Sequence, residues 1–190
     1  MTNSENRNKR FLPKNRGKKE IVFQNKFHKL YHTKVDFDGF SKDYFVNDHG
    51  ERIAVLVLKE QEVLLVRQYR YLINDLSYEL PGGGVKNGES FKQAIIRECF
   101  EETGIEIENL KQLFDYNISL DTLHNYTRIF YTSDFKVIEE RISNPKEVVE
   151  HLWIPLERCL EMITTKEIID SMTIMGLLYY SLKSKTDLKI

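Results

Sequence analysis

The sequence predicts an α/β protein with a mixed sheet, preceded by an N-terminal arm of antiparallel strands. Residues 53–58 read IAVLVL, a continuous apolar run that is typical of a strand buried on both faces. Other strand-like segments lie before and between two helical segments, and short turns join some of them as hairpins. Because a hairpin reverses the chain, this pattern favours a mixed sheet over a doubly wound parallel one.

The first 49 residues are expected to form a tail and an arm. Residues 1–19 carry seven basic side chains and one acidic side chain, and they have few apolar groups to anchor them, so we predict a flexible basic tail. Residues 20–27 and 27–37 alternate loosely between apolar and polar, as half-buried antiparallel strands do, and Asp38-Gly39 predicts a turn. We place an arm over residues 20–49 and the main domain over residues 50–185.

Strands and helices can then be assigned along the main domain. A turn at residues 59–61 leads from the buried strand into a second strand, and a short third strand stops at Pro81, before a loop of three glycines. The expected strands cover residues 53–58, 62–70, 77–80, 110–118, 126–135 and 148–154. A second helical region is expected over residues 156–184, with a break near residues 166–170.

The first helix has clear signals at both ends. Ser90 and Gln93 have the spacing of a capping box, which predicts a helix start at Phe91. Gly104 supplies the left-handed residue that commonly ends a helix. We therefore predict a helix over residues 91–103, with Cys99 on its buried stripe as a small apolar side chain rather than a nucleophile.

Composition and charge exclude several classes of protein. The 190 residues are 41% hydrophobic and 30% charged, which suits one globular domain with a small arm. No stretch approaches the roughly 20 apolar residues of a membrane span, and two cysteines are too few for a disulfide framework. We expect a cytoplasmic protein with no membrane partner. Beyond the tail the net charge is −7, which argues against nucleic acid as the main partner.

Three carboxylates share one patch of the predicted helix. Glu98, Glu101 and Glu102 have the spacing i, i+3, i+4, which places like charges side by side. Such an oxygen-rich cluster suits hard cations such as Mg²⁺ or Mn²⁺, although a solvated acidic face is the alternative. The preceding glycines, residues 82–84, would let backbone groups approach a bound metal or phosphate.

This segment resembles the Nudix box, G-x5-E-x7-R-E-U-x-E-E-x-G-U, in which U is apolar. The nine matching positions are Gly83, Glu89, Arg97, Glu98, Cys99, Glu101, Glu102, Gly104 and Ile105. The flanking runs at residues 66–71 and 78–83 resemble the ADP-ribose pyrophosphatase-like branch of the Nudix hydrolases, which act on nucleoside diphosphate sugars. The resemblance implies a Nudix-type α/β/α sandwich, and a homodimer built through the N-terminal strands.

The resemblance also implies roles for particular residues. Glu98, Glu101 and Glu102 would bind Mg²⁺, with Mn²⁺ as a substitute and the Gly82 carbonyl as a further ligand. Glu89, Arg97 and Gly104 would support the box, the first two as a pair that braces the loop against the helix. The general base would be a glutamate of the loop at residues 136–146 or just after it, with Glu147 as the first choice and Glu139 and Glu140 as alternatives.

Substrate contacts are expected from the strands before the box. Arg67, Arg70, Glu79 and Gly83 are the candidates for binding diphosphate or ribose, since the planar fork of arginine matches phosphate oxygens in pairs. The alternative is an Arg–Glu ion pair between neighbouring strands.

The implied activity is Mg²⁺-dependent hydrolysis of a nucleoside diphosphate sugar to a nucleoside monophosphate and a sugar phosphate, with ADP-ribose first and GDP-mannose next. The proline that ADP-ribose enzymes carry some fifteen residues after the box is missing, which leaves the sugar and base open. The alternatives are a hydrolase of nucleoside triphosphates or dinucleoside polyphosphates, and a non-catalytic sensor of nucleotide sugars.

Overall fold

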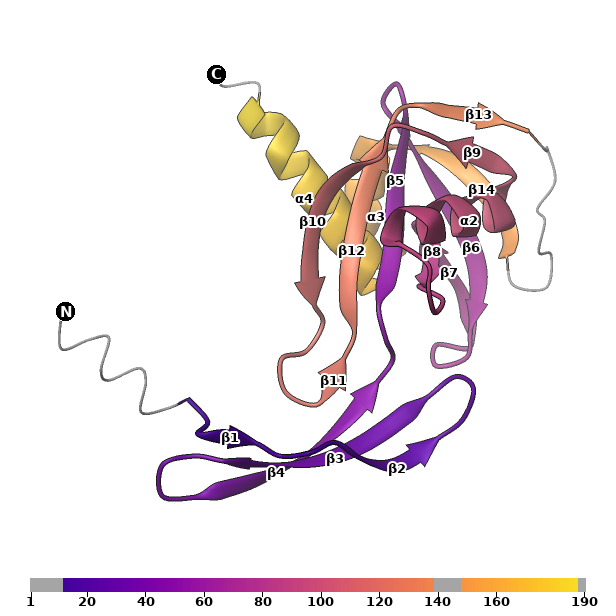
Figure 1. Ribbon diagram of the computed structural model, residues 1–190. Helices are drawn as coiled ribbons and strands as arrows, with labels where there is room; N and C mark the ends of the chain where they lie inside the picture. The colour runs from indigo at the N-terminus through magenta and orange to yellow at the C-terminus, as the bar shows by residue number, and fades with distance from the viewer. Residues whose placement is uncertain (1–11, 139–147, 188–190) are drawn as a thin grey trace. The chain divides into compact units, whose positions relative to one another are not determined.

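A computed structural model describes residues 12–138 and 148–187 (Figure 1). The described chain divides into two compact units. One lies within residues 1–50 and 117–125, and the other within residues 51–116 and 126–190. Of the predicted basic tail, residues 12–19 are described, and they include the short strand β1 (Asn15–Arg16). No helix in the described part of the chain is long and apolar enough to cross a membrane.

The first unit is a sheet centred on β3. The antiparallel partners of β3 (Lys29–Asp36) are β1, β2 (Glu20–Gln24) and β4 (Ser41–Asp48), and β11 (Leu123–His124) adds to β4 in parallel. The turn predicted at Asp38-Gly39 is present, with Gly39 at φ 93°. Strand β4 was not predicted because only Val46 is buried along it, so its sequence lacks a regular apolar alternation.

The second unit is built on a mixed sheet of seven strands. The main path runs β10–β12–β5–β6–β14, with β7 beside β6 and β8 beside β5. Strand β12 runs parallel to β5, whereas β6 runs antiparallel to β5, β7 and β14, as a mixed sheet requires. The bounds are β5 (Arg52–Lys59), β6 (Glu62–Arg70), β7 (Asp75–Glu79), β8 (Gly82–Gly84), β10 (Lys111–Asn117), β12 (Tyr126–Thr132) and β14 (Val148–Pro155).

Two predictions for this unit were wrong in detail. The glycines at residues 82–84 were expected to form a loop, but they pair antiparallel with residues 52–54 as β8. The strand expected over residues 126–135 ends at Thr132, whose hydroxyl accepts from Asp134 N–H and turns the chain. The chain continues as β13 (Phe135–Val137), which pairs with β9 (Ile105–Ile107), and neither short strand was predicted.

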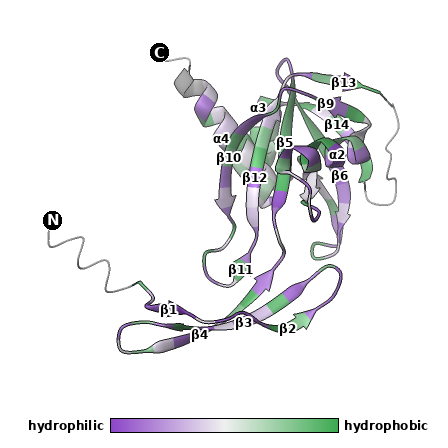
Figure 2. Ribbon diagram, in the orientation of Figure 1, coloured by the Kyte–Doolittle hydropathy of each residue, from purple (hydrophilic) through white to green (hydrophobic). Residues whose placement is uncertain are grey.

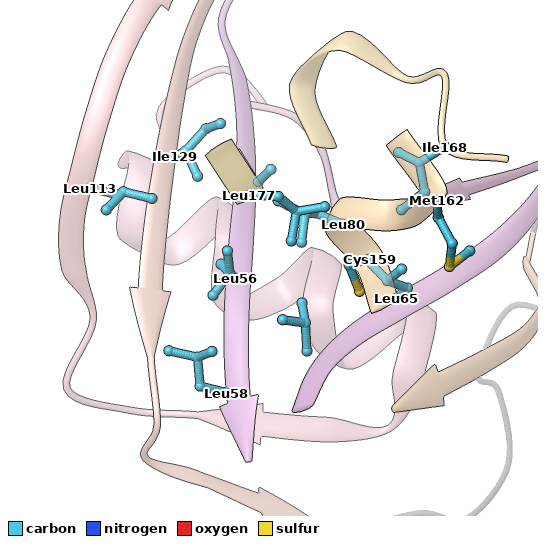
Figure 3. Packing of buried hydrophobic residues seen from close by; sticks show 12 residues of the cluster. Leu56, Leu58, Leu65, Leu80, Leu113, Ile129, Cys159, Met162, Ile168 and Leu177 are labelled. Carbon is cyan, nitrogen blue, oxygen red and sulfur yellow. The ribbon is translucent and has the colours of Figure 1, made fainter. Parts of the chain in front are cut away.

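Helices cover both faces of this sheet, so the predicted α/β/α sandwich is confirmed (Figure 1). Alternate residues of β5 enter different cores: Val55 and Val57 join the core of α2 (Phe91–Thr103), and Leu56 joins the core of α3 (Leu156–Thr164) and α4 (Ser171–Asp187). Figure 3 shows this second core, and Figure 2 shows the hydrophobic residues along β5. The predicted helix break is present, with Lys166 at φ 65° between α3 and α4.

Candidate active site

Helix α2 is fixed at both ends and along one side. The Ser90 side chain accepts from Gln93 N–H and the Gln93 side chain accepts from Ser90 N–H, which completes the predicted capping box. Gly104 closes the helix at φ 69°. Ile95 and Cys99 are fully buried, and burial raises the pKa of the Cys99 thiol to about 12, so this thiol is not a nucleophile. The buried side sets the rotation of the helix and therefore the direction of its glutamates.

Glu102 is the buried member of the carboxylate cluster. Its side chain accepts a 2.9 Å hydrogen bond from Gly82 N–H, and the residue is only 6% exposed. The pKa of Glu102 is raised to about 8, chiefly by burial and also by the negative charges of Glu98 and Glu79, while the hydrogen bond from Gly82 opposes the rise. A carboxylate in this position gains more from a nearby cation than an exposed one does.

Glu98 lies against strand β8, the glycine strand, which consists of residues 82–84. A Cβ atom at Gly83 would lie 2.5 Å from Cδ of Glu98, so a larger residue there would displace this carboxylate from its present position. Glu98 Oε1 also lies 2.7 Å from Arg97 Nη1. Strand β8 thus holds Glu102 through a backbone N–H and gives Glu98 its space.

Arg97 connects the loop before α2 with the helix. Its Nε and Nη2 atoms donate to the two oxygens of Glu89 at 2.8 and 2.9 Å, and Nη2 also donates to the Gly84 carbonyl. The hydrogen bonds from Arg97 lower the pKa of Glu89 to about 2. Arg97 Nη1 donates to Glu101, the more exposed glutamate of the cluster, at 3.2 Å. Arg97 therefore joins Glu89, Gly84 and the helix in one network.

The carboxylate oxygens of the cluster are of the type that binds a hard divalent cation, but they are not gathered around one point. Among the described residues, no three His, Cys, Asp or Glu side chains are close enough together to hold a metal ion. Each glutamate instead faces a neighbouring donor, either Gly82 N–H or Arg97. The candidate ligand atoms are all carboxylate oxygens. The pKa of Glu102 is raised chiefly by burial and also by the charge of Glu98, and a bound Mg²⁺ or Mn²⁺ would favour the charged carboxylate.

The candidate substrate-binding residues of the sheet are in ion pairs. Arg70 on β6 donates through Nε to Glu79 on β7 at 2.7 Å and through Nη2 to the other oxygen, and Gln68 Nε2 also donates to Glu79. Arg67 donates to Glu150 on β14 at 2.7 Å. This is the pairing between neighbouring strands that the sequence left as an alternative. In this arrangement Glu79 lies close enough to Glu102 for their charges to interact. Arg67 instead points towards β14.

A hollow of about 380 Å³ opens beside the Arg70–Glu79 pair. Exposed apolar side chains of Tyr71, Leu72 and Ile169 line its rim, and Asp170 lies beside the ion pair. Sequence reasoning did not select Gln68, although it lies in the flanking run at residues 66–71, and it did not select Asp170, which lies outside the recognised motif. The candidate general bases Glu139, Glu140 and Glu147 lie outside the described residues.

Comparisons with known proteins bear on the family and the fold. The family model described as NUDIX domain matches residues 48–171. The chain is 28% identical over 168 residues to the ADP-ribose pyrophosphatase of Bacillus subtilis (strain 168), covering 87% of this chain and 91% of that protein. It is also 28% identical over 174 residues to the GDP-mannose pyrophosphatase of Yersinia enterocolitica, covering 84% and 91%. A crystal structure of an ADP compounds hydrolase has the same fold, with a TM-score of 0.76 and 16% identity over 94% of this chain and 96% of that one.

Proposed function

Because the chain belongs to the NUDIX domain family and is a hydrolase of pyrophosphate bonds, we propose that it cleaves the diphosphate of a nucleoside diphosphate sugar. The products are a nucleoside monophosphate and a sugar phosphate. ADP-ribose is the first candidate substrate and GDP-mannose the second, and the similarity to pyrophosphatases of both kinds supports this class. The observation that carries the proposal is the buried Glu102 beside Glu98, both against the glycine strand.

In this proposal the acidic cluster holds Mg²⁺. Glu98, Glu102 and the Gly82 carbonyl are the ligands, and Glu101 is a further one. The cation, when bound, neutralises charge on the diphosphate and lowers the pKa of a bound water. To bind the cation, Glu98 would give up its contact with Arg97. Arg97 would keep its ion pair with Glu89 and so hold the loop before α2 in place.

The remaining roles belong to groups around the cluster. Glu147, or Glu139 or Glu140 in its place, takes the proton of the attacking water. Gly83 lets the diphosphate approach the backbone. Arg70, whose side chain is half exposed, faces the substrate, and Glu79 orients it through their two hydrogen bonds.

The proposal includes a homodimer formed through the arm. Strand β2 exposes Ile21, Val22 and Phe23, and Phe27 just after it is 79% exposed. Exposed apolar groups gathered on one short segment are typical of an interface, and a second copy of the chain is the partner that the resemblance implies.

A substrate panel tests the activity. Purified protein with Mg²⁺ is given ADP-ribose, GDP-mannose, nucleoside triphosphates and dinucleoside polyphosphates, and the products are separated by chromatography. We expect nucleoside monophosphate and sugar phosphate from a sugar nucleotide, and no turnover with EDTA. Faster cleavage of triphosphates or dinucleoside polyphosphates would contradict the substrate class, and no turnover of any member would contradict the enzymatic proposal.

A further inference from the structure

A buried threonine of α4 holds the backbone just before the glycine strand. Thr173 Oγ1 accepts a 2.9 Å hydrogen bond from Leu80 N–H and donates at 2.7 Å to Asp170 Oδ2. Asp170 also accepts from Thr173 N–H at 2.8 Å. Thr173 is fully buried and Leu80 is 1% exposed, so water does not substitute for this hydroxyl. The hydroxyl is used in both directions, as acceptor for Leu80 and as donor to Asp170.

The segment from Leu80 to Gly82 is held by three different elements. Leu80 N–H bonds to Thr173 on α4, the Pro81 carbonyl accepts from Val55 N–H on β5 at 2.9 Å, and Gly82 N–H bonds to Glu102 on α2. Three successive residues therefore each place one backbone group on a fixed partner.

Helix α4 also contacts Leu80 through its side chain. Gly176 lies one turn after Thr173, and a Cβ atom there would be 2.8 Å from Leu80 Cδ1. Because Gly176 has no side chain, the helix backbone packs directly against the Leu80 side chain. The hydroxyl fixes the backbone of Leu80 while this packing fixes its side chain.

We propose that Thr173, oriented by Asp170, is a positioning residue that fixes the Leu80–Gly82 backbone for metal binding. The inference rests on the proposed function, in which Gly82 and Glu102 serve the cation. Without the hydroxyl, Leu80 N–H loses its partner, and the backbone at Gly82 gains freedom that cation binding must remove. Substituting residues that hold metal ligands in place typically weakens metal affinity by about 10–100-fold.

Direct Mn²⁺ binding, measured by the electron paramagnetic resonance signal of free Mn²⁺, tests this role. Thr173→Val removes the hydroxyl and keeps the shape, and Thr173→Ser restores it. Thr132→Val is the matched control, because Thr132 is also buried and its hydroxyl donates to the Glu108 carbonyl, away from the glycine strand. Unfolding temperatures are measured on the same samples.

We expect T173V to bind Mn²⁺ about 10-fold or more weakly than the wild type, and T173S and T132V to bind nearly as the wild type does. A purely structural role predicts a lower unfolding temperature with unchanged affinity for Mn²⁺, and this result overturns the inference. If T173V does not fold, Thr173→Cys decides in the same way, because its thiol is a weak donor and acceptor. A wild-type protein that binds no Mn²⁺ overturns the proposed metal site and this inference together, whereas equal binding by wild type and T173V overturns only the inference.

Discussion

At the scale of single residues, Glu102 combines burial, a neighbouring negative charge and a backbone hydrogen bond. Glutamine keeps the shape and can accept from Gly82 N–H, but it cannot carry the charge that a cation would neutralise. We expect Glu102→Gln to stay folded with an unfolding temperature no lower than that of the wild type, since burial opposes a charge at this position and glutamine is neutral. Turnover should fall about 100-fold or more, beyond the range seen for residues that only neighbour a metal.

Steady-state kinetics with ADP-ribose and circular dichroism of the same preparations check this prediction. Glu106→Gln, on the exposed side of β9, is the control and should leave both values unchanged. Near-normal turnover of E102Q would remove Glu102 from the metal site.

Glu89 gives a prediction about pH. Hydrogen bonds from Arg97 lower the pKa of Glu89 from 4.5 to about 2. A carboxyl group with a lowered pKa contributes stability above its unfolded pKa, and this contribution is lost as the pH falls from about 4.5 towards 2. We therefore expect Glu89→Gln to unfold at a lower temperature than the wild type at neutral pH, with a difference that shrinks as the solution is acidified. Thermal unfolding followed across this pH range tests it, and a difference independent of pH would count against the ion pair.

At the scale of elements, the three glycines of β8 meet three different surroundings. A Cβ atom would lie 2.3 Å from the Ile53 carbonyl oxygen at Gly82, and 2.5 Å from the carboxyl carbon of Glu98 at Gly83. At Gly84 the nearest atom, an Arg52 nitrogen, is 3.7 Å away. The first clash is with the backbone, the second is with a candidate metal ligand, and the third position has room.

Alanine substitutions should therefore separate stability from activity. We expect Gly82→Ala to cost roughly 1–3 kcal/mol of unfolding free energy, because the β5 backbone must move. Gly83→Ala should stay folded but lose about 10-fold or more in kcat/KM, because Glu98 is displaced from a proposed ligand position. Gly84→Ala is the matched control and should resemble the wild type. Urea unfolding and kinetics on all three variants measure this, and equal effects at Gly83 and Gly84 would contradict the role of Glu98.

The same elements show what sequence can predict. Helix α2 is predictable at both ends because Ser90, Gln93 and Gly104 act within a few residues of one another. Strand β8 is not, since three glycines have no strand signal and their pairing depends on β5, some thirty residues earlier in the chain. Strand β4 was missed because its exposed face and sparse burial leave no periodic pattern.

At the scale of the whole molecule, the motif predicts the family and the enzyme class, and long-range contacts decide the details. The acidic patch and the pairing candidates Arg70 and Glu79 could be selected from sequence. Other pairings could not be predicted, because Arg67 meets Glu150 across 83 residues and Leu80 meets Thr173 across 93. Such contacts are set by the order of strands and the packing of α4, which no local pattern contains.

Assembly is the remaining prediction at this scale. Among the described strands β2 pairs with β3 alone, so its other edge presents backbone groups together with exposed apolar side chains, and a second chain could cover both. At about 25 cal/mol per Å² of apolar surface, covering several such side chains in each chain is a substantial driving force for association. We expect the wild type to sediment at twice the chain mass of 22.6 kDa, and the double variant Phe23→Ser, Phe27→Ser to sediment at the chain mass. Met175→Ser with Leu178→Ser, two exposed apolar positions on α4, is the control and should leave the wild-type mass unchanged. A wild type that remains monomeric at every concentration tested would exclude the dimer, and a double variant that stays dimeric would move the interface away from β2.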